Sequence, residues 1–525
     1  MLDRRSFAKL ALAANAALLL GGSARASGGL RFGPATPFTF ELLVERARAR
    51  AGAPYAPPPR PDPAIVAELD YDGHRDVRFK PERALWSDSR KAFAVTFEHV
   101  GRYFPQTVRM NAVEGDVARE ILYDPAYFAM PAGHPAERLA EQPSAFAGFS
   151  INEPSKSGDW MALEPWTVFL GASYFRASGE YAQVGLSARG IAIGTGDPRP
   201  EEFPDFVEFW FAPAESRDEP ATVFALLDGP SVAGAYRFDL RRTKGVVMDI
   251  EARLFPRRRI ERLGIAPLTS MYWFSETAKP AMIDWRPEVH DSDGLAMWTG
   301  TGERIWRPLN NPPYTMVSSF LDDDPRGFGL LQRDRDFNNY QDGVRYEARP
   351  SAWVEPRGGW GRGAVQLVEL NTDDEIHDNI VAMWVPAVAP EAGAELDYRY
   401  RLHWLGDEPY PTDLGRVVAT RMGNGGQPGL PRPRGVRKFM VEFFGGPLAD
   451  LAYGEVPKPI LSASRGTFSY IFAEAVPNDV PGHWRAQFDL TVEGSEPVDL
   501  RCYLRSGDKV LTETWLYQYH PDGSV

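Results

Sequence analysis

Short stretches of alternating or continuous apolar residues dominate the chain, and Gly, Pro, Asp and Asn clusters separate them. Side chains of a strand alternate between its two faces, so this period of two predicts strands. The 48 Gly and 46 Pro residues supply the turns that a large antiparallel β-protein needs. No repeat of fixed period is visible, which disfavours a propeller or a solenoid. The clearest predicted strands are 206–212, 221–227, 235–240, 246–254, 364–370, 379–385 and 396–405.

Helical patterns are few. One amphipathic helix is predicted over Phe40–Ala51, because Thr39 can cap it and Glu41 and Glu45 lie near its positive N-terminal end. A shorter helix is predicted over Pro63–Leu69. The fold class is therefore all-β.

The strand pattern breaks at GDEPYPT, residues 406–412. Closely spaced strands follow this break and are typical of a small immunoglobulin-like β-sandwich. We predict a large N-terminal β-domain over 27–405 and an immunoglobulin-like domain over 406–525. The Gly/Pro/Arg loop 423–435 is either a functional loop or a solvated connection. The predicted C-terminal strands lie near 438–444, 467–474, 483–492, 498–504 and 510–519.

Residues 1–26 are predicted to be a removable twin-arginine export signal. Arg4 and Arg5 precede the short apolar run Leu10–Leu20, and Ala24-Arg25-Ala26 resembles a cleavage site. A membrane span needs about 20 apolar residues, and this run is shorter. No second apolar run approaches that length, so the mature chain is not expected to span the membrane. An anchored N-terminal helix is the alternative. The predicted location is the periplasm.

Composition narrows the function further. The 525 residues are 25% charged and 43% hydrophobic, as in an ordinary globular protein. The net charge of −13 argues against nucleic acid or anionic lipid as a partner. The single cysteine, Cys502, excludes an internal disulfide and is predicted to be a packed thiol in a strand. The eight histidines have no paired metal spacing, so neither a metal nor another cofactor is expected.

Carboxylates and aromatic residues are concentrated between Asp284 and Trp384. Sugar rings stack on Trp and Tyr, hydroxyls bond to Asp, Asn and Arg, and a pair of carboxyl groups cleaves glycosidic bonds. This composition predicts a carbohydrate site.

Long motifs in and before this stretch resemble the periplasmic glucan biosynthesis proteins of the G/D family, over roughly residues 38–519. These proteins act on osmoregulated periplasmic glucans, whose backbone is β-1,2-linked glucose. The twin-arginine signal resembles the D-type member. The motifs include SYFRASGEYAQVGLSARGIAI, RPEVHDSDGL, RGFGLLQRDRDFNNYQD, RPSAWVEPRGGWGRG and DNIVAMW.

The resemblance implies a fold and an activity. The expected fold is a large β-sandwich of the galactose-mutarotase type followed by the immunoglobulin-like sandwich. The expected activity is that of an inverting β-1,2-glucanase, with Asp378 as general acid and Asp291 as general base acting through a relay of waters. Glu375 and Tyr346 match cleft positions, and Glu375 is a candidate like-charged neighbour that raises the pKa of Asp378. His290 either orients Asp291 or packs.

Five further residues are predicted to bind substrate: Asp293, Asp342, Arg345, Trp353 and Trp360. Alternatives stay open for each of them. Asp293, Asp342 and the nearby acids Asp334 and Asp336 can instead pair with neighbouring arginines. Most aromatic side chains of a β-sandwich are core, so about two of the five tryptophans in this stretch are expected at the cleft. These tryptophans are Trp298, Trp306, Trp353, Trp360 and Trp384.

Two functions remain open at this point. The first is an endo-acting β-1,2-glucanase that shapes the glucan during synthesis. The second is a non-hydrolytic glucan-binding factor that assists backbone elongation, branching or release together with the inner-membrane glucan synthase. The expected partners are β-1,2-glucan and that synthase. The resemblance also allows a homodimer, for which the sequence holds no interface signature.

Overall fold

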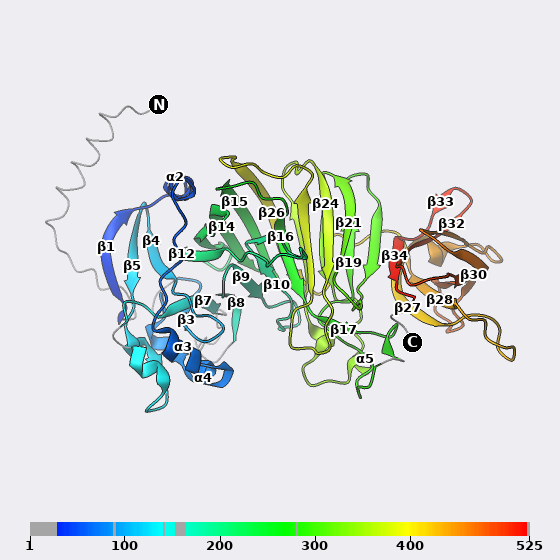
Figure 1. Cartoon of the computed structure of the whole chain (residues 1–525), viewed down its shortest axis with the longest axis horizontal. Coiled ribbons are helices and arrows are strands. Elements are labelled where there is room, and N and C mark those ends of the chain that lie inside the picture. The colour runs from blue at the N-terminus through cyan, green and yellow to red at the C-terminus, as the bar shows by residue number, and fades with distance from the viewer. Residues whose placement is uncertain (1–28, 88–90, 140–141, 153–163, 280–281, 522–525) are drawn as a thin grey trace.

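A computed structural model describes residues 29–87, 91–139, 142–152, 164–279 and 282–521 (Figure 1). The predicted export signal lies outside these residues. Strands arranged in several sheets are far more abundant than helices in the described chain, which confirms the all-β class. The predicted strands 206–212, 246–254 and 396–405 correspond to β12, β15 and β26, whose bounds follow.

The larger sheet has 16 strands within the described residues and runs along most of the molecule. Its β33 (Lys509–Val510) pairs with β32 beside the main path. The order along that path is β1 (Arg31–Pro37), β5 (Val117–Leu122), β4 (Arg109–Glu114), β12 (Asp205–Ala212), β13 (Ala221–Asp228), β14 (Val232–Arg242), β15 (Val246–Pro256), β26 (Leu396–Leu405), β23 (Ser351–Pro356), β22 (Gly327–Leu331), β19 (Gly294–Trp298), β20 (Arg304–Pro308), β34 (Thr514–Tyr519), β32 (Val498–Ser506) and β29 (Lys458–Ala463).

A second sheet has ten strands within the described residues. Its β11 (Ile191–Ile193) pairs with β16 beside the main path. The order is β21 (Met316–Asp323), β24 (Arg362–Glu369), β25 (Ile380–Pro386), β16 (Leu263–Ser270), β10 (Ser187–Arg189), β9 (Tyr174–Ala177), β8 (Pro165–Leu170), β7 (Phe146–Asn152) and β3 (Val95–His99).

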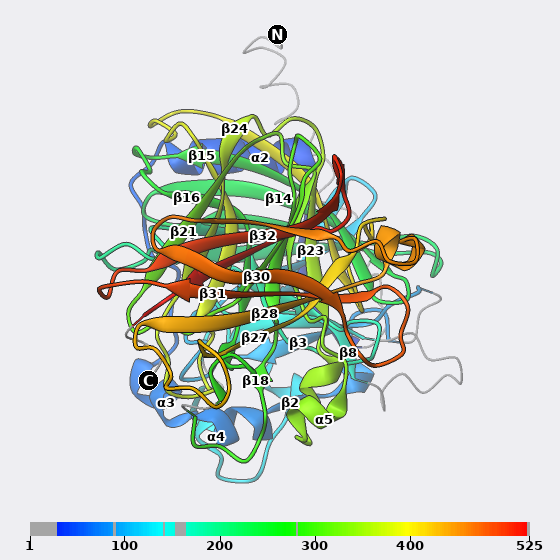
Figure 2. The same ribbon diagram turned by 90° about the vertical axis from the view of Figure 1, so that its right-hand side faces the viewer.

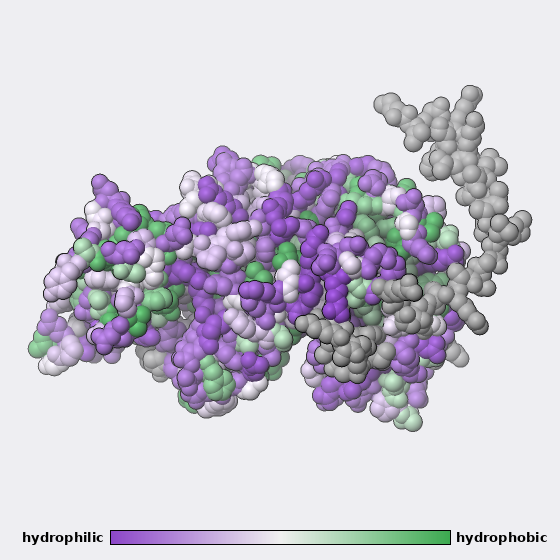
Figure 3. All heavy atoms as spheres, turned by 180° about the vertical axis from the view of Figure 1, so that it is seen from behind, coloured by the Kyte–Doolittle hydropathy of each residue, from purple (hydrophilic) through white to green (hydrophobic). Residues whose placement is uncertain are grey.

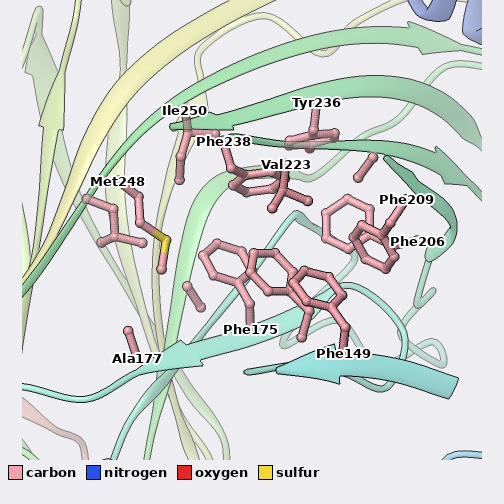
Figure 4. Packing of buried hydrophobic residues seen from close by; sticks show 14 of the residues in the cluster. Phe149, Phe175, Ala177, Phe206, Phe209, Val223, Tyr236, Phe238, Met248 and Ile250 are labelled. Atoms are coloured by element: carbon pink, nitrogen blue, oxygen red, sulfur yellow. The ribbon is translucent and has the colours of Figure 1, made fainter. Parts of the chain in front are cut away.

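Aromatic side chains hold these two sheets face to face (Figure 4). Phe149 and Phe169 of the second sheet stack with ring centroids 4.8 Å apart. Phe209 of the larger sheet meets the edge of Phe149 at 4.9 Å. Interdigitated inner faces of this kind are what a β-sandwich core requires.

The predicted helix Phe40–Ala51 is confirmed as α2, and the Thr39 side chain caps it by accepting a hydrogen bond from the Leu42 N–H. Its buried Leu43 packs in one cluster with residues of β13, β14 and β15, so α2 covers the outer face of the larger sheet. The predicted helix at 63–69 is α3 (Pro63–Glu68). Two more short helices are α4 (Tyr71–Asp76) and α5 (Phe337–Tyr340).

The C-terminal strands form a second, smaller sandwich (Figure 2). One layer is β27 (Arg416–Asn424), β28 (Val436–Phe444), β31 (His483–Thr491) and β30 (Thr467–Ala475), and the other is β29, β32 and β34. Phe439, Phe488 and Trp515 fill its core together with Cys502. Burial raises the pKa of the Cys502 thiol, so the prediction of a packed thiol is confirmed.

One connection was not predicted. β34 pairs in parallel with β20 at Ile305 and Trp306, so the second layer of the small sandwich continues the larger sheet. The division at residues 405 and 406 stays a prediction.

Two short two-stranded sheets complete the described part: β17 (Tyr272–Phe274) with β18 (Val289–His290), and β2 (Arg78–Phe79) with β6 (Phe128–Ala129). Seen from behind, the surface is largely hydrophilic, with hydrophobic residues in separate patches (Figure 3). Within the described residues no helix has both the length and the apolar character needed to cross a membrane.

The aromatic core generates a stability prediction. Phe149→Ala is expected to lower the free energy of unfolding by about 3–5 kcal/mol, because the cavity that it leaves is enclosed by other rings. Urea unfolding followed by fluorescence measures this loss. Phe444→Ala is the matched control, since Phe444 on β28 is 44% exposed, and its loss is expected to stay below about 1 kcal/mol. Equal losses for the two variants would contradict the assignment of Phe149 to the core.

Candidate active site

A short stretch of backbone, Ser270–Tyr272, positions both candidate catalytic carboxylates. The Asp291 N–H donates to the Met271 carbonyl at 2.8 Å on one side. On the other side, the Asn379 N–H donates to the Ser270 carbonyl at 3.1 Å. The Asn379 side chain also accepts from the Tyr272 N–H at 2.8 Å and donates to the Tyr272 carbonyl at 2.9 Å. Asp291 and Asp378 therefore flank one central strand.

Strand spacing sets the scale of this arrangement. β17 pairs with β18, which leads directly into Asp291, and β16 pairs with β25, which follows Asp378 and Asn379. Neighbouring paired strands lie about 4.8 Å apart, so the backbone that carries each acid lies about one strand spacing from this segment.

Asp291 is nearly buried, with 8% of its surface exposed. Burial raises the pKa of its carboxyl to about 6, and repulsion by Asp378 raises it further, whereas the Arg349 guanidinium opposes the shift. The Arg349 Nε lies 3.1 Å from the Asp291 Oδ1. The carboxyl is thus held beside one cation and within electrostatic range of the second acid.

Asp378 is open to solvent on one side. Desolvation by the surrounding protein nevertheless raises the pKa of its carboxyl, and Arg176 and Arg189 oppose that rise. Arg189 is fixed on β10 by bonds from its Nε to Thr269 and from its Nη1 to Glu201. Asp378 therefore lies where a ligand can reach it, above a buried arginine.

Glu375 belongs to a different group of charges. Arg286, a buried residue, donates to Glu375 at 2.6 Å and to Asp342 at 2.8 Å, and makes two bonds of 3.0 Å to Asp284. The Tyr346 hydroxyl donates to the same Glu375 oxygen at 2.7 Å. This corrects the suggestion that Glu375 raises the pKa of Asp378, because the charge of Glu375 is occupied by Arg286 and the shift of Asp378 comes from burial.

His290 does not hydrogen-bond to Asp291. Its Nε2 lies 3.0 Å from Glu288, and its Nδ1 lies 3.1 Å from Gln332 and 3.4 Å from Asp293. Despite full burial, these acids raise the pKa of His290 to about 9, and its positive charge in turn lowers the pKa of Asp291. His290 is thus packed and paired, and it acts on Asp291 through its charge.

Asp293 is half-buried beside His290, whose Nδ1 lies 3.4 Å from its Oδ1. Burial raises the pKa of its carboxyl to about 6, and it accepts hydrogen bonds from the backbone N–H groups of Arg333 and Asp334. Arg345 is exposed, and its Nε lies 3.2 Å from Glu347. The structure therefore groups Glu375, Tyr346 and Asp342 around Arg286, and leaves Arg345 apart on the surface.

The predicted stacking tryptophans need correction. Trp353 is 1% exposed and Trp360 is 7% exposed, and both pack in hydrophobic clusters. Side chains with so little accessible surface offer no ring face to a sugar. Trp306 and Trp384 are also buried, so of the five tryptophans only Trp298 keeps partial exposure.

Different aromatic residues lie at the site. Trp285 is 68% exposed, and its ring centre lies 5.6 Å from the Arg286 guanidinium. Trp273 lies 5.9 Å from the same group. Sequence analysis did not single out Trp273, Trp285, Arg286 or Arg349 as site residues. Trp285 and Arg286 occur inside the acidic phrase DWRPEVHDSD, where a lone arginine among carboxylates was the one sign of an ion-pair centre.

Within the described part of the chain, no group of three or more His, Cys, Asp and Glu side chains is arranged to hold a metal ion. The site as described consists of carboxylates, arginines and aromatic side chains.

Sequence comparisons identify the family. Residues 38–519 match the family described as "Periplasmic glucan biosynthesis protein, MdoG", and the chain belongs to this family. It is 61% identical to glucans biosynthesis protein D 2 of Ralstonia nicotianae over 512 residues, which cover 96% of this chain and 95% of the relative.

Two other relatives support the same assignment. Glucans biosynthesis protein D of Xanthomonas campestris is 45% identical over 531 aligned positions, and that of Stenotrophomonas maltophilia is 47% identical over 533. Both alignments cover 99% of this chain and 98% of the relative. The family places the protein in periplasmic glucan biosynthesis, and the names of the relatives agree with the predicted D type.

The buried His290 generates a pH prediction. Its pKa is about 9 in the folded protein and about 6.5 in an unfolded chain. The folded state therefore keeps a proton that the unfolded state releases, so this stabilisation is complete below about pH 6.5 and is lost as the pH rises to about 9. We expect the free energy of unfolding to fall across this window by an amount on the order of 1–3 kcal/mol.

Chemical denaturation at several pH values measures this slope. His290→Gln is expected to flatten it, because the glutamine keeps polar contacts without titrating. The control is His483→Gln, at a position outside this cluster. A wild-type slope that survives in His290→Gln would show that another group causes it.

Proposed function

We propose that this protein is an inverting endo-β-1,2-glucanase that shapes the periplasmic glucan during its synthesis. The observation that carries the proposal is the pair Asp291 and Asp378, held on either side of Ser270–Tyr272 with the pKa of both carboxyl groups raised. Family membership supports glucan as the substrate class.

The electrostatics of the pair favour the required protonation state. Repulsion by Asp378 raises the pKa of Asp291, so once one carboxyl is ionised the other loses its proton less readily. A pH range therefore exists in which the pair carries one proton. An inverting glycosidase needs one protonated acid and one ionised base.

The roles follow from exposure and from the family resemblance. Asp378, open to solvent, donates its proton to the oxygen of the glycosidic bond. Asp291, deeper in the site, accepts a proton from the attacking water through a relay of waters. Retaining enzymes hold their carboxyl groups about 5–5.5 Å apart and inverting ones about 6.5–9.5 Å apart. The inverting assignment of Asp291 and Asp378 is carried by the family resemblance.

Substrate binding is proposed for the group around Arg286. Glu375, Asp342 and Tyr346 present oxygen atoms that suit sugar hydroxyls. Arg286 donates to Glu375 and Asp342, and the Tyr346 hydroxyl donates to Glu375. Substrate binding is also proposed for Arg345 at the surface and for Asp293 beside His290. Export by the twin-arginine signal is proposed on the motif in residues 1–26. Contact with the inner-membrane synthase and formation of a homodimer are proposed on the resemblance alone.

The carboxylates generate an activity prediction. With linear β-1,2-glucan as substrate, Asp378→Asn and Asp291→Asn are each expected to lower kcat by about 10²–10⁴-fold, the usual contribution of general acid–base catalysis. Newly formed reducing ends measure the rate. Asp397→Asn is the control, because Asp397 is exposed on the outer face of β26 and is expected to keep the wild-type rate.

Each outcome decides between the two functions. Wild-type protein that binds β-1,2-glucan but forms no reducing ends would overturn hydrolysis and favour the glucan-binding factor. Turnover that Asp378→Asn leaves unchanged would overturn the assignment of the acid. Equal thermal stability of the variants confirms that the loss is chemical.

A further inference from the structure

A cavity of about 370 Å³ lies where the large β-domain meets the C-terminal sandwich. Its walls come from β17 and the segment after it, the loop at 310–313, the end of β27, and the strands β28 and β34. In Figure 1, β17 lies next to β27 and β34, although the segments are far apart in the sequence. The side chains that define its chemistry are Trp273, Met282, Asn311, Asn424, Arg437 and Tyr519.

The cavity is structurally connected to the candidate active site. The Asn311 side chain donates to the Trp273 carbonyl at 3.1 Å and to the Thr372 carbonyl at 2.7 Å, and accepts from the Thr372 N–H at 3.0 Å. Thr372 begins the loop that leads to Glu375 and Asp378. The Asn379 side chain binds both backbone groups of Tyr272, another wall residue. One hydrogen-bonded frame therefore supports both the cavity wall and the proposed general acid.

The lining suits a neutral polyhydroxylated ligand. Trp273 is partly exposed and provides an aromatic surface, while Asn424 and Arg437 are joined by a 3.2 Å hydrogen bond at the rim. Burial lowers the pKa of His520, also in the wall, to about 4, so its imidazole is uncharged at neutral pH. Pockets that combine apolar and aromatic walls with a few polar groups hold small ligands in volumes of about 300–1,000 Å³.

Two other ligand classes fit less well. A lipid chain would cover the rim amide and guanidinium with hydrocarbon that offers no hydrogen bond in place of water, which is costly. An anionic ligand would meet only one cation, Arg437, among these wall residues. A sugar ring uses both properties of the wall, since its C–H face packs on an aromatic surface and its hydroxyls bond to amides.

We propose that this cavity is a secondary subsite that binds glucosyl residues of the β-1,2-glucan chain away from the point of cleavage. The proposal rests on the proposed function, because the ligand is that same glucan. A long chain engages both the carboxylates and this cavity, whereas a short oligosaccharide reaches only the carboxylates. The second contact increases affinity because it becomes intramolecular once the chain is bound.

A bulky substitution at the cavity wall tests the proposal. Gly423 lines the cavity, and a Cβ at this position meets no atom within 4 Å, so Gly423→Phe adds a ring at the wall without a clash at its Cβ. Linear β-1,2-glucans of short and of polymeric length are the probes. We expect KM for the polymer to rise about ten-fold, equivalent to about 1.4 kcal/mol, with kcat and all constants for the short substrate unchanged. Val510→Phe, at a 44% exposed position of β33, is the control for an added aromatic side chain.

The outcomes separate this proposal from the proposed function. If wild type cleaves both substrates and Gly423→Phe behaves like wild type on both, the secondary subsite is wrong and the glucanase stands. If wild type cleaves neither but binds the polymer more tightly than Gly423→Phe does by calorimetry, the subsite stands and hydrolysis fails. If wild type neither binds nor cleaves, both fail. Asn424→Ala, which removes a rim amide without adding volume, gives the same readout should Gly423→Phe fold poorly.

Discussion

The hydrogen bonds of Ser270, Met271 and Tyr272 are the constraint on which the candidate site depends. These residues lie where strand β16 gives way to β17, and they receive Asp291 from one side and the Asn379 anchor of Asp378 from the other. Two of these four bonds join backbone groups and the other two come from the Asn379 side chain, so the placement of both acids follows from this backbone segment and from Asn379. The side chains around them can vary without changing it, provided that Asn379 keeps both of its bonds to Tyr272.

The acids that this backbone segment and its neighbours bring together differ in how their charge is balanced. Burial raises the pKa of Asp291, Asp293 and Asp378, and local cations oppose the rise to different degrees. Glu375 and Asp342 are instead paired with Arg286. The carboxylates therefore fall into two groups: those whose pKa burial raises and those paired with Arg286.

Much of the fold could be predicted from the sequence, because local pattern encodes it. The period-two stretches became strands, and Thr39 capped α2 as its residue type suggests. The pairing of β20 with β34 could not be predicted, since it joins residues some two hundred positions apart and depends on no local motif. Trp353 and Trp360 were misassigned because composition shows where aromatic residues gather and does not show which face of a sheet they occupy.

The candidate pair, Asp291 and Asp378, came from family resemblance, and the structure adds how the backbone around these two residues is held. Arg286 was visible in the same motif but had no spacing that marked it as the centre of three ion pairs, which only the folded loops bring together. The cavity behind Trp273 was likewise beyond sequence analysis, because its walls come from both sandwiches.

The most direct test of the central claim is the anomeric configuration of the first product released from linear β-1,2-glucan, followed by proton NMR before mutarotation. The roles proposed for Asp291 and Asp378, a general acid and a general base, predict direct attack by water and an α-configured reducing end. A β-configured product would require a covalent intermediate and closely spaced carboxyl groups. It would contradict the account given for Asp291 and Asp378.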